Sequence, residues 1–352
     1  GFPTYGETDV DSYSVNPRFT SQFQAAGLTH NTTVGWDLYD YRLENRSAAG
    51  KGDIGDPTST KDLDQRQTAW YFHDVMTLDR WSFTLGARRL NVDTETETTG
   101  FSAGQGEDSQ DAEMYEGGVR YHFDGGLDLF AGAQRSVRIV NADEITPDDE
   151  LLEPQTGEQY TLGASWQKGI QTSTLTAWQG RFDNEIVFNP YAGGFGSNVN
   201  LEDRTLRRGV SLNSRWRLDR DLTLVLNGTL QRAEFDEGEW EGNDVPLVSR
   251  QLFYAQANWQ ALSWLELSLA HRYVGKRRFD NDQPNDFQQI DSYRMTDLEA
   301  TARYQNAYLR IGAYNLEDEL AADYGVKAIS NPSYNAYPLP ERHYRVSLGM
   351  EF

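Results

Sequence analysis

The sequence contains no cysteine among its 352 residues, so disulfides and thiolate metal sites are excluded. Packing and hydrogen bonds must therefore hold the fold together. No apolar run approaches the roughly 18 residues that a membrane-spanning helix needs, which excludes a helical membrane protein. No basic segment followed by an apolar segment opens the chain, so we expect a mature or internal sequence.

Basic residues are scarce relative to acidic ones. The chain has 32 Lys and Arg against 54 Asp and Glu, which gives a formal net charge of −22. This balance argues against nucleic acid and against a polybasic membrane-surface segment. The few histidines lie far apart along the chain and show no metal-ligand spacing: His30, His73, His122, His271 and His343. We therefore expect no resident metal or cofactor.

Aromatic residues are plentiful, with 19 Tyr, 16 Phe and 9 Trp. Such side chains are typical of strands and of the interfacial girdles of membrane barrels. Hydrophobic residues make up only 38% of the chain, but only every second residue of a barrel strand faces lipid. A soluble all-β protein with aromatic cores is the alternative.

Apolar and polar residues alternate in several segments, which is the pattern of strands with two different faces. In the last segment, Tyr344, Val346, Leu348, Met350 and Phe352 alternate with His343, Arg345, Ser347, Gly349 and Glu351. The same alternation occurs around Leu222 to Leu230, Leu265 to Leu269, and Phe83 to Ala87. A repeated alternation of this kind favours a sheet with one lipid-facing side.

The connections come in two lengths that alternate along the chain. Short turns are expected near Gly27, Asp79-Arg80, Asp124-Gly125-Gly126, Lys168-Gly169, Asp219-Arg220-Asp221, Ala261-Leu262-Ser263 and Gln305-Asn306. Longer polar connections are expected at about 45–62, 97–111, 139–156, 189–199, 237–247, 280–288 and 318–340. Outer-membrane barrels have short periplasmic turns and long extracellular loops, so the pattern indicates an all-β, transmembrane antiparallel β-barrel.

These turns predict about 15 strands, and an odd count is unusual for a bacterial barrel. Barrels of about 22 strands form plugged outer-membrane transporters. We therefore expect residues 1–352 to be a single barrel domain, N-terminally incomplete, with the plug and the first strands missing. Counts of about 14 or 16 stay open, because strand boundaries are the weakest part of such a prediction and residues 1–11 could hold part of another strand.

Two motifs and a terminal strand stand out near the end of the chain, at 313–318, 337–342 and 344–352: Ala-Tyr-Asn-Leu-Glu-Asp, Tyr-Pro-Leu-Pro-Glu-Arg and an alternating tail that ends in Phe. Together they resemble the barrel of TonB-dependent outer-membrane receptors of the ferric-siderophore type. The stretch Ala313-Tyr314-Asn315-Leu316-Glu317-Asp318 is similar to their Val-x-Asn-Leu-Phe-Asp motif, with Glu317 in place of Phe. Tyr337-Pro338-Leu339-Pro340-Glu341-Arg342 is similar to their Pro-x-Pro-x-Arg motif. The tail from Tyr344 to Phe352 resembles the final strand of bacterial outer-membrane proteins.

Three further stretches are similar to the same family and occur in the family's order. Residues 152–163 resemble its Leu-x-Pro-Glu-x-x-x-x-Tyr-Glu-x-Gly stretch, 208–212 its Arg-Gly-Val-Glu-Leu strand start, and 243–248 its Gly-Asn-x-Pro-x-x-Pro loop. The resemblance implies an outer-membrane receptor that binds a ferric chelate outside the cell and imports it to the periplasm. It also implies two kinds of partner: the TonB-ExbB-ExbD complex, acting through the missing plug, and outer-membrane lipid with lipopolysaccharide.

Candidate ligand-binding residues are aromatic or cationic side chains on the predicted loops and upper wall. Rings can stack on a bulky chelate, and arginines can donate paired hydrogen bonds to an anionic one. The residues that fit are Tyr191, Phe195, Arg204, Arg207, Trp240, Tyr334 and Tyr337. The alternative is that these rings belong to the girdle and the arginines neutralise loop acids.

Two charged stretches are further candidates. Lys276-Arg277-Arg278 could contact lipopolysaccharide phosphates or an anionic chelate, or could neutralise acids of neighbouring loops. The acidic stretches Asp143-Glu144 and Asp148-Asp149-Glu150 could hold a divalent cation, but they lack the spacing of a calcium loop, which favours a solvated loop.

No Gly-x-Ser-x-Gly elbow or comparable cluster is present, so we predict that the protein is not an enzyme. Two alternatives to siderophore import remain open. One is a TonB-dependent receptor for another cargo, such as cobalamin, haem, a quinone cofactor or a sugar; the other is a passive porin.

Overall fold

The structure is a computed structural model that describes residues 5–100, 103–141, 144, 152–189, 197–328 and 333–350. These residues form 22 strands and one short 3-10 turn, η1, at Lys51–Asp53. None of the helical segments in the described part of the chain is both long and apolar enough to span a membrane. The chain divides into two compact units, one made of residues 1–119, 132–159 and 182–204, the other of residues 120–131, 160–181 and 205–352.

The first unit is built on long hairpins near the N-terminus. Its strands are β1 (Tyr5–Val15), β2 (Arg18–Ala25), β3 (Leu28–Ala48), β4 (Ser59–Leu78), β5 (Trp81–Thr98), most of β6 (Gly104–His122), and the small pair β10 (Ile186–Asn189) and β11 (Ser197–Asn200). Both β1 and β2 pair with β3, each along a different half. Pro17 lies between them and has no N–H to give to the ladder, so β1 and β2 are one strand position with an interruption.

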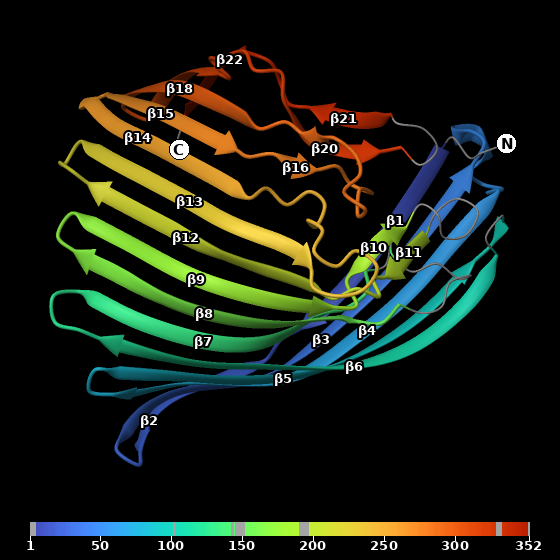
Figure 1. Ribbon diagram of the computed structural model, residues 1–352. Coiled ribbons are helices and arrows are strands. Elements are labelled where there is room, and N and C mark those ends of the chain that lie inside the picture. The colour runs from blue at the N-terminus through green and yellow to red at the C-terminus, as the bar shows by residue number, and fades with distance from the viewer. Residues whose placement is uncertain are drawn as a thin grey trace. The chain divides into compact units, whose positions relative to one another are not determined.

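The second unit contains a run of antiparallel neighbours, seen side by side in Figure 1 from β12 to β15. Its main strands are β12 (Thr205–Arg217), β13 (Leu222–Phe235), β14 (Gln251–Leu262), β15 (Leu265–Val274), β18 (Tyr293–Tyr304), β19 (Ala307–Tyr314) and β22 (His343–Met350). Two small hairpins lie in its loops: β16 (Arg277–Arg278) with β17 (Gln289–Ile290), and β20 (Ala322–Lys327) with β21 (Tyr334–Pro338). Residues of β7 (Leu127–Arg138), β8 (Gln155–Lys168) and β9 (Gln171–Asp183) are divided between the units.

The predicted short turns are confirmed, since each joins two paired strands. The connections at the opposite ends are longer, with one correction: β5 and β6 are joined by residues 99–103 where a long connection at 97–111 was expected, because both strands extend into that segment. At the turn between β6 and β7, Gly126 has φ +85°, and a Cβ there would lie 2.0 Å from the carbonyl oxygen of Gln167. Only glycine fits this position, because both the backbone conformation and the close approach exclude a side chain.

The two faces of the sheet differ as the alternation predicts. In the second unit, one row of cross-strand partners reads Tyr344, Ala313, Leu298 and Leu269. The next row, on the opposite face, reads Arg345, Gly312, Glu299 and Ser268. We call the first of these the apolar face. Leu226 and Leu230 lie on it and are 43% and 53% exposed, so the leucines of β13 are not packed inside a compact core.

The strand count agrees with the prediction of about 15. Among the described residues, 16 strands belong to the main sheet, and its path visits 15 positions because β2 shares one with β1. Residues 5–11 are part of β1 and therefore add no further position. Buried apolar residues of the first unit form small clusters, one around Leu63 and the other around Ala69, Leu90 and Val92.

Candidate ligand-binding site

Three long loops of the second unit are bonded to one another at the end opposite the short turns. They are the loops 236–250, 275–292 and 315–342. Asp244 and Asn285 exchange two hydrogen bonds: the Asp244 N–H donates to Asn285 Oδ1 at 2.8 Å, and Asn285 Nδ2 donates to the Asp244 carbonyl at 2.9 Å. Asn285 has φ +58°, a left-handed conformation that asparagine tolerates better than most residues. The first two loops are thus joined to each other by hydrogen bonds between the Asp244 backbone and the Asn285 side chain.

The β20–β21 hairpin packs its rings against the loop 275–292. Phe279 is only 3% exposed, and its ring centroid lies 4.8 Å from that of Tyr334 and 5.6 Å from that of Phe287. Gly325 permits this contact, since a Cβ there would lie 2.5 Å from the Phe279 ring. The aromatic packing fixes the hairpin to the loop, and Figure 1 shows both its strands at the red end of the chain.

A buried ionic group lies beside these rings. Lys327 Nζ lies 3.4 Å from Oδ1 of Asp282, which is fully buried, and it also binds Asp286. Arg278 Nη1 lies 3.6 Å from the other oxygen of Asp282. Burial raises the pKa of Asp282, whereas the hydrogen bond from Lys327 lowers the pKa of Asp286. The two acids respond in opposite directions because only one of them is removed from water.

Arg277 and Arg278 do not form the exposed basic patch that the sequence suggested. Arg277 is 4% exposed and donates to the carbonyls of Ala322 and Asp323 at 2.8 and 2.7 Å. Arg278 donates to the carbonyls of Asn285 and Phe287 at 3.1 and 2.9 Å. Their guanidinium groups hold the loops together, which agrees with the alternative that these cations serve neighbouring loops. Lys276 stays exposed and pairs with Asp291 at 3.2 Å.

The hairpin exposes tyrosine rings, whereas Lys327 of β20 is paired with Asp282 and Asp286. Tyr334 and Tyr337 are 48% and 61% exposed, and Tyr324 is 37% exposed. The rings of Tyr324 and Tyr337 lie 5.3 Å apart. Tyr324 also donates its phenol hydrogen to Asp280 at 2.5 Å, which fixes that ring. Tyr334 lies on the face of the hairpin that packs on Phe279, and the Tyr324–Tyr337 pair lies on the other face. These rings can stack on a planar or apolar ligand and offer phenol hydrogen bonds. We call these three residues the tyrosine surface.

The base of the loop 315–342 is closed by Asn315, the central residue of the first family-like motif. It is 2% exposed, and its amide donates to the carbonyls of Glu319 and Pro340 at 3.0 and 3.2 Å. Its own N–H donates to Asp297 at 2.9 Å. The motif is therefore a structural closure of this loop. Glu317, which replaces a phenylalanine, accepts a hydrogen bond from the backbone N–H of Thr296 at 2.8 Å.

The structure brings together only part of the predicted ligand set. Tyr334 and Tyr337 belong to the tyrosine surface, whereas Trp240 packs on Phe235 in another loop, with ring centroids 5.6 Å apart. Arg204 and Arg207 are partly buried. Tyr191 and Phe195 lie outside the described residues, as do Asp143, Asp148, Asp149 and Glu150. Glu144 forms an ion pair with Arg138.

Sequence reasoning missed Phe279 and Phe287, which pack against Tyr334, and Lys327, which is the cross-strand partner of Tyr334. Their signal was weak because each stands alone among polar loop residues, and no local period connects positions about 45 residues apart. In the described part of the chain, no group of three His, Cys, Asp or Glu side chains is arranged to hold a metal ion.

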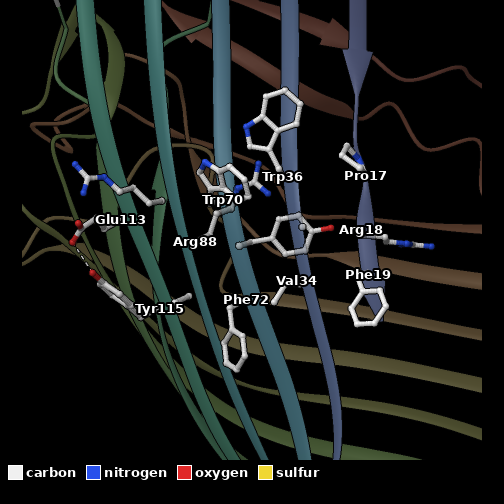
Figure 2. Close-up of a pocket in the computed structure, with 14 residues that line it drawn as sticks. Pro17, Arg18, Phe19, Val34, Trp36, Trp70, Phe72, Arg88, Glu113 and Tyr115 are labelled. Atoms are coloured by element: carbon white, nitrogen blue, oxygen red, sulfur yellow. Dashed lines mark hydrogen bonds between the residues drawn. The ribbon is translucent and has the colours of Figure 1, made fainter. Parts of the chain in front are cut away.

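The first unit carries a separate groove of about 730 Å³, shown in Figure 2. Its rings include Trp36 and Trp70, whose centroids lie 6.2 Å apart, and Trp70 is 70% exposed. Phe19, Val34, Phe72 and Ala87 are cross-strand partners on the same face of β2 to β5. Because this row is apolar, we interpret the groove as part of an aromatic girdle rather than as a site for a soluble chelate.

A family model matches most of the chain. Residues 1–316 match the family model described as TonB dependent receptor-like, β-barrel, a family of outer-membrane β-barrels. The chain is 23% identical to the ferrioxamine receptor of Yersinia enterocolitica over 385 aligned residues, covering 98% of this chain and 51% of that protein.

Solved structures show the same fold. The ferric-catecholate import receptor Fiu of E. coli K12 superposes with a TM-score of 0.80 at 15% identity, covering 99% of this chain and 55% of that one. The siderophore receptor PiuA of Acinetobacter baumannii gives a TM-score of 0.82 at 16% identity, covering 97% and 56%. The chain spans about half the length of these proteins.

Proposed function

Since this chain belongs to the TonB-dependent receptor-like β-barrel family, we propose that it is the larger part of the barrel of an outer-membrane receptor that imports a ferric siderophore. The long loops would face the outside of the cell and the short turns the periplasm. The observation that supports the proposal is the tyrosine surface, which lies among the long loops on a hairpin that packs on Phe279 through Tyr334.

The geometry suits capture of a chelate by stacking. Two exposed rings, Tyr334 and Tyr337, come from one short strand, β21; the buried Phe279 packs on Tyr334 and limits the motion of that ring, and Tyr337 packs on Tyr324. Aromatic stacking contributes about 0.5–1.5 kcal/mol per ring pair beyond the buried area. The relatives' names support the same class of cargo, since they include receptors for ferrioxamine and for ferric catecholates.

Transport would need parts of the protein outside residues 1–352. We propose that residues 1–352 belong to one barrel domain and that a plug and further strands precede them in the encoded protein. Energy would come from the TonB-ExbB-ExbD complex acting through that plug. The iron chelate would be cargo, and the chain would act as a receptor rather than an enzyme. Sequencing the coding region upstream tests this part: a plug and about seven further strands are expected there.

Growth on defined iron sources tests the function. The full-length gene is expressed in a strain that lacks its own siderophore receptors, under iron limitation. Growth on ferrioxamine B, a ferric catecholate or ferric citrate, dependent on an intact TonB gene, is the expected result. Growth on none of them, with normal outer-membrane levels of the protein, would contradict siderophore import. TonB-dependent use of haem or cobalamin would identify another cargo, and TonB-independent conductance would identify a porin.

A further inference from the structure

The three long loops around the tyrosine surface carry an excess of acid. Loops 236–250, 275–292 and 315–342 together contain fourteen Asp and Glu against six Lys and Arg. A ligand that reaches the tyrosine surface therefore enters a negative field. Such a field attracts cations and repels anions, and salt screens it where the charges are exposed.

All six basic side chains of these loops bond to the loops themselves. Three of them, Arg277, Arg278 and Lys327, are largely buried, with 4%, 20% and 18% of each side chain exposed. The other three are also engaged: Lys276 pairs with Asp291, Arg250 pairs with Asp244, and Arg342 donates to the carbonyl of Leu316. Within the described parts of the three loops, no cation is left over to receive an anionic chelate.

One carboxylate lies against the tyrosine surface without a cationic partner. Oδ2 of Asp280 accepts the phenol hydrogen of Tyr324, and Oδ1 accepts the N–H of Asn281 at 3.0 Å. The Asp280 backbone is also bonded to the hairpin, since its N–H donates to the carbonyl of Gly325 at 2.9 Å and its carbonyl accepts the N–H of Lys327 at 3.0 Å. Among the described residues, no Lys, Arg or His side chain pairs with this carboxylate. Asp280 thus places a negative charge beside exposed rings.

We propose that the tyrosine surface takes a ferric chelate with a positively charged ammonium arm and discriminates against anionic chelates. The arm lies against the rings of Tyr324 and Tyr337, whose centroids are 5.3 Å apart, and pairs with Asp280. A cation is attracted both to the face of a tyrosine ring and to a carboxylate. The inference rests on the proposed function, because it concerns the charge of the same cargo. It replaces the expectation that arginines bind an anionic chelate.

Three derivatives of one chelate test the charge preference. Ferrioxamine B carries a free ammonium, its N-acetyl derivative is neutral and its N-succinyl derivative is anionic, whereas all three hold iron in the same hydroxamate core. Their affinities are measured by fluorescence titration of the full-length protein in detergent at low salt. Ferrioxamine B is expected to bind most tightly and the succinyl derivative most weakly, with about 10-fold between them, which is about 1.4 kcal/mol. Added salt should narrow this difference.

Asp280→Asn removes the charge and keeps an acceptor for Tyr324. It should weaken the binding of ferrioxamine B about 5-fold and leave the binding of the N-acetyl derivative unchanged. Asp291→Asn is the matched control, because it removes the same charge from the same loop at an acid that is 88% exposed and pairs with Lys276. This control should keep the full preference for ferrioxamine B.

Equal affinity for the three derivatives, or tighter binding of the succinyl derivative, would overturn the proposal. The wild-type series decides this point even where Asp280→Asn fails to fold. A full preference in Asp280→Asn, or an equal loss in Asp291→Asn, would overturn the placement of the ammonium at Asp280. Binding of a ferric catecholate or ferric citrate, but of none of the three derivatives, would overturn the charge assignment and leave siderophore import standing. Siderophore import itself fails only if no ferric chelate supports TonB-dependent growth, so the two failures are distinguishable.

Discussion

The backbone N–H of Arg342 donates a hydrogen bond to the carboxylate of Asp318 at 2.9 Å, and its guanidinium donates to the carbonyl of Leu316 at 2.8 Å. The two family-like motifs at the ends of the loop 315–342 therefore bind each other. This explains in physical terms why both motifs occur at these positions: together they close the loop that presents the tyrosine surface.

Asp318→Ala should loosen this closure. Loss of the carboxylate leaves the Arg342 N–H to bond with water, and a hydrogen bond of this kind contributes about 0.5–1.5 kcal/mol. We expect faster hydrogen exchange in peptides covering 316–342. Glu341→Ala, an exposed neighbour, is the control. Equal protection in both variants would show that the Asp318 contact does not hold the loop.

Lys327→Met should destabilise the loop 275–292 by more than Asp318→Ala destabilises the loop 315–342. Removing the cation leaves Asp282 fully buried beside Arg278 alone, and breaking a buried pair typically costs about 3–5 kcal/mol. The double variant Asp282→Asn/Lys327→Met should recover part of this loss, since the buried charge is also removed. Native-state hydrogen exchange of peptides covering 279–290 measures both. Asp282→Asn alone is measured as well. If the free-energy loss in the double variant equals the sum of the losses in the two single variants, these residues are not coupled.

Acid should weaken the ion pair between Lys327 and Asp286. Lys327 lowers the pKa of Asp286 below its usual value of 3.8, so the contribution of this pair is present above that pH and is lost as pH falls through the lower folded value. Hydrogen exchange of 322–328, corrected for the intrinsic rate, should show less protection near pH 3 than at pH 5. In Lys327→Met this difference should shrink. An undiminished pH effect in the variant would assign it to another group.

The ligand prediction concerns the tyrosine surface. Tyr334→Ala and Tyr337→Ala together should weaken binding of the ferric chelate by about 10-fold, because two exposed rings are lost while Phe279 stays in place. Tyr304→Ala is the control, since this tyrosine is 76% exposed at the short-turn end. Fluorescence titration with the chelate that supports growth gives both affinities. Unchanged affinity in the double variant would place the ligand elsewhere.

The strands and turns of this protein could be predicted from the sequence because their signals are local. Alternation along Leu222 to Leu230 and turn residues such as Gly126 depend on neighbours a few positions away. Pro17 is likewise a local signal for the interruption between β1 and β2. The burial of the Arg277 side chain and the pairing of Lys327 with Asp282 could not be predicted. Both depend on contacts between loops that lie about 45 residues apart in the sequence. For the same reason the small β20–β21 hairpin was interpreted as one long loop.

The central claim is that one face of the sheet meets lipid and the other meets water. Spin labels on single introduced cysteines at 222–230, in the full-length protein in lipid bilayers, test it most directly, since this chain has no cysteine of its own. Labels at Leu224, Leu226 and Leu230 should be accessible to oxygen, and labels at Thr223, Val225 and Asn227 to a water-soluble nickel chelate. Accessibility without this two-residue period, or oxygen-accessible labels on both faces, would contradict the account.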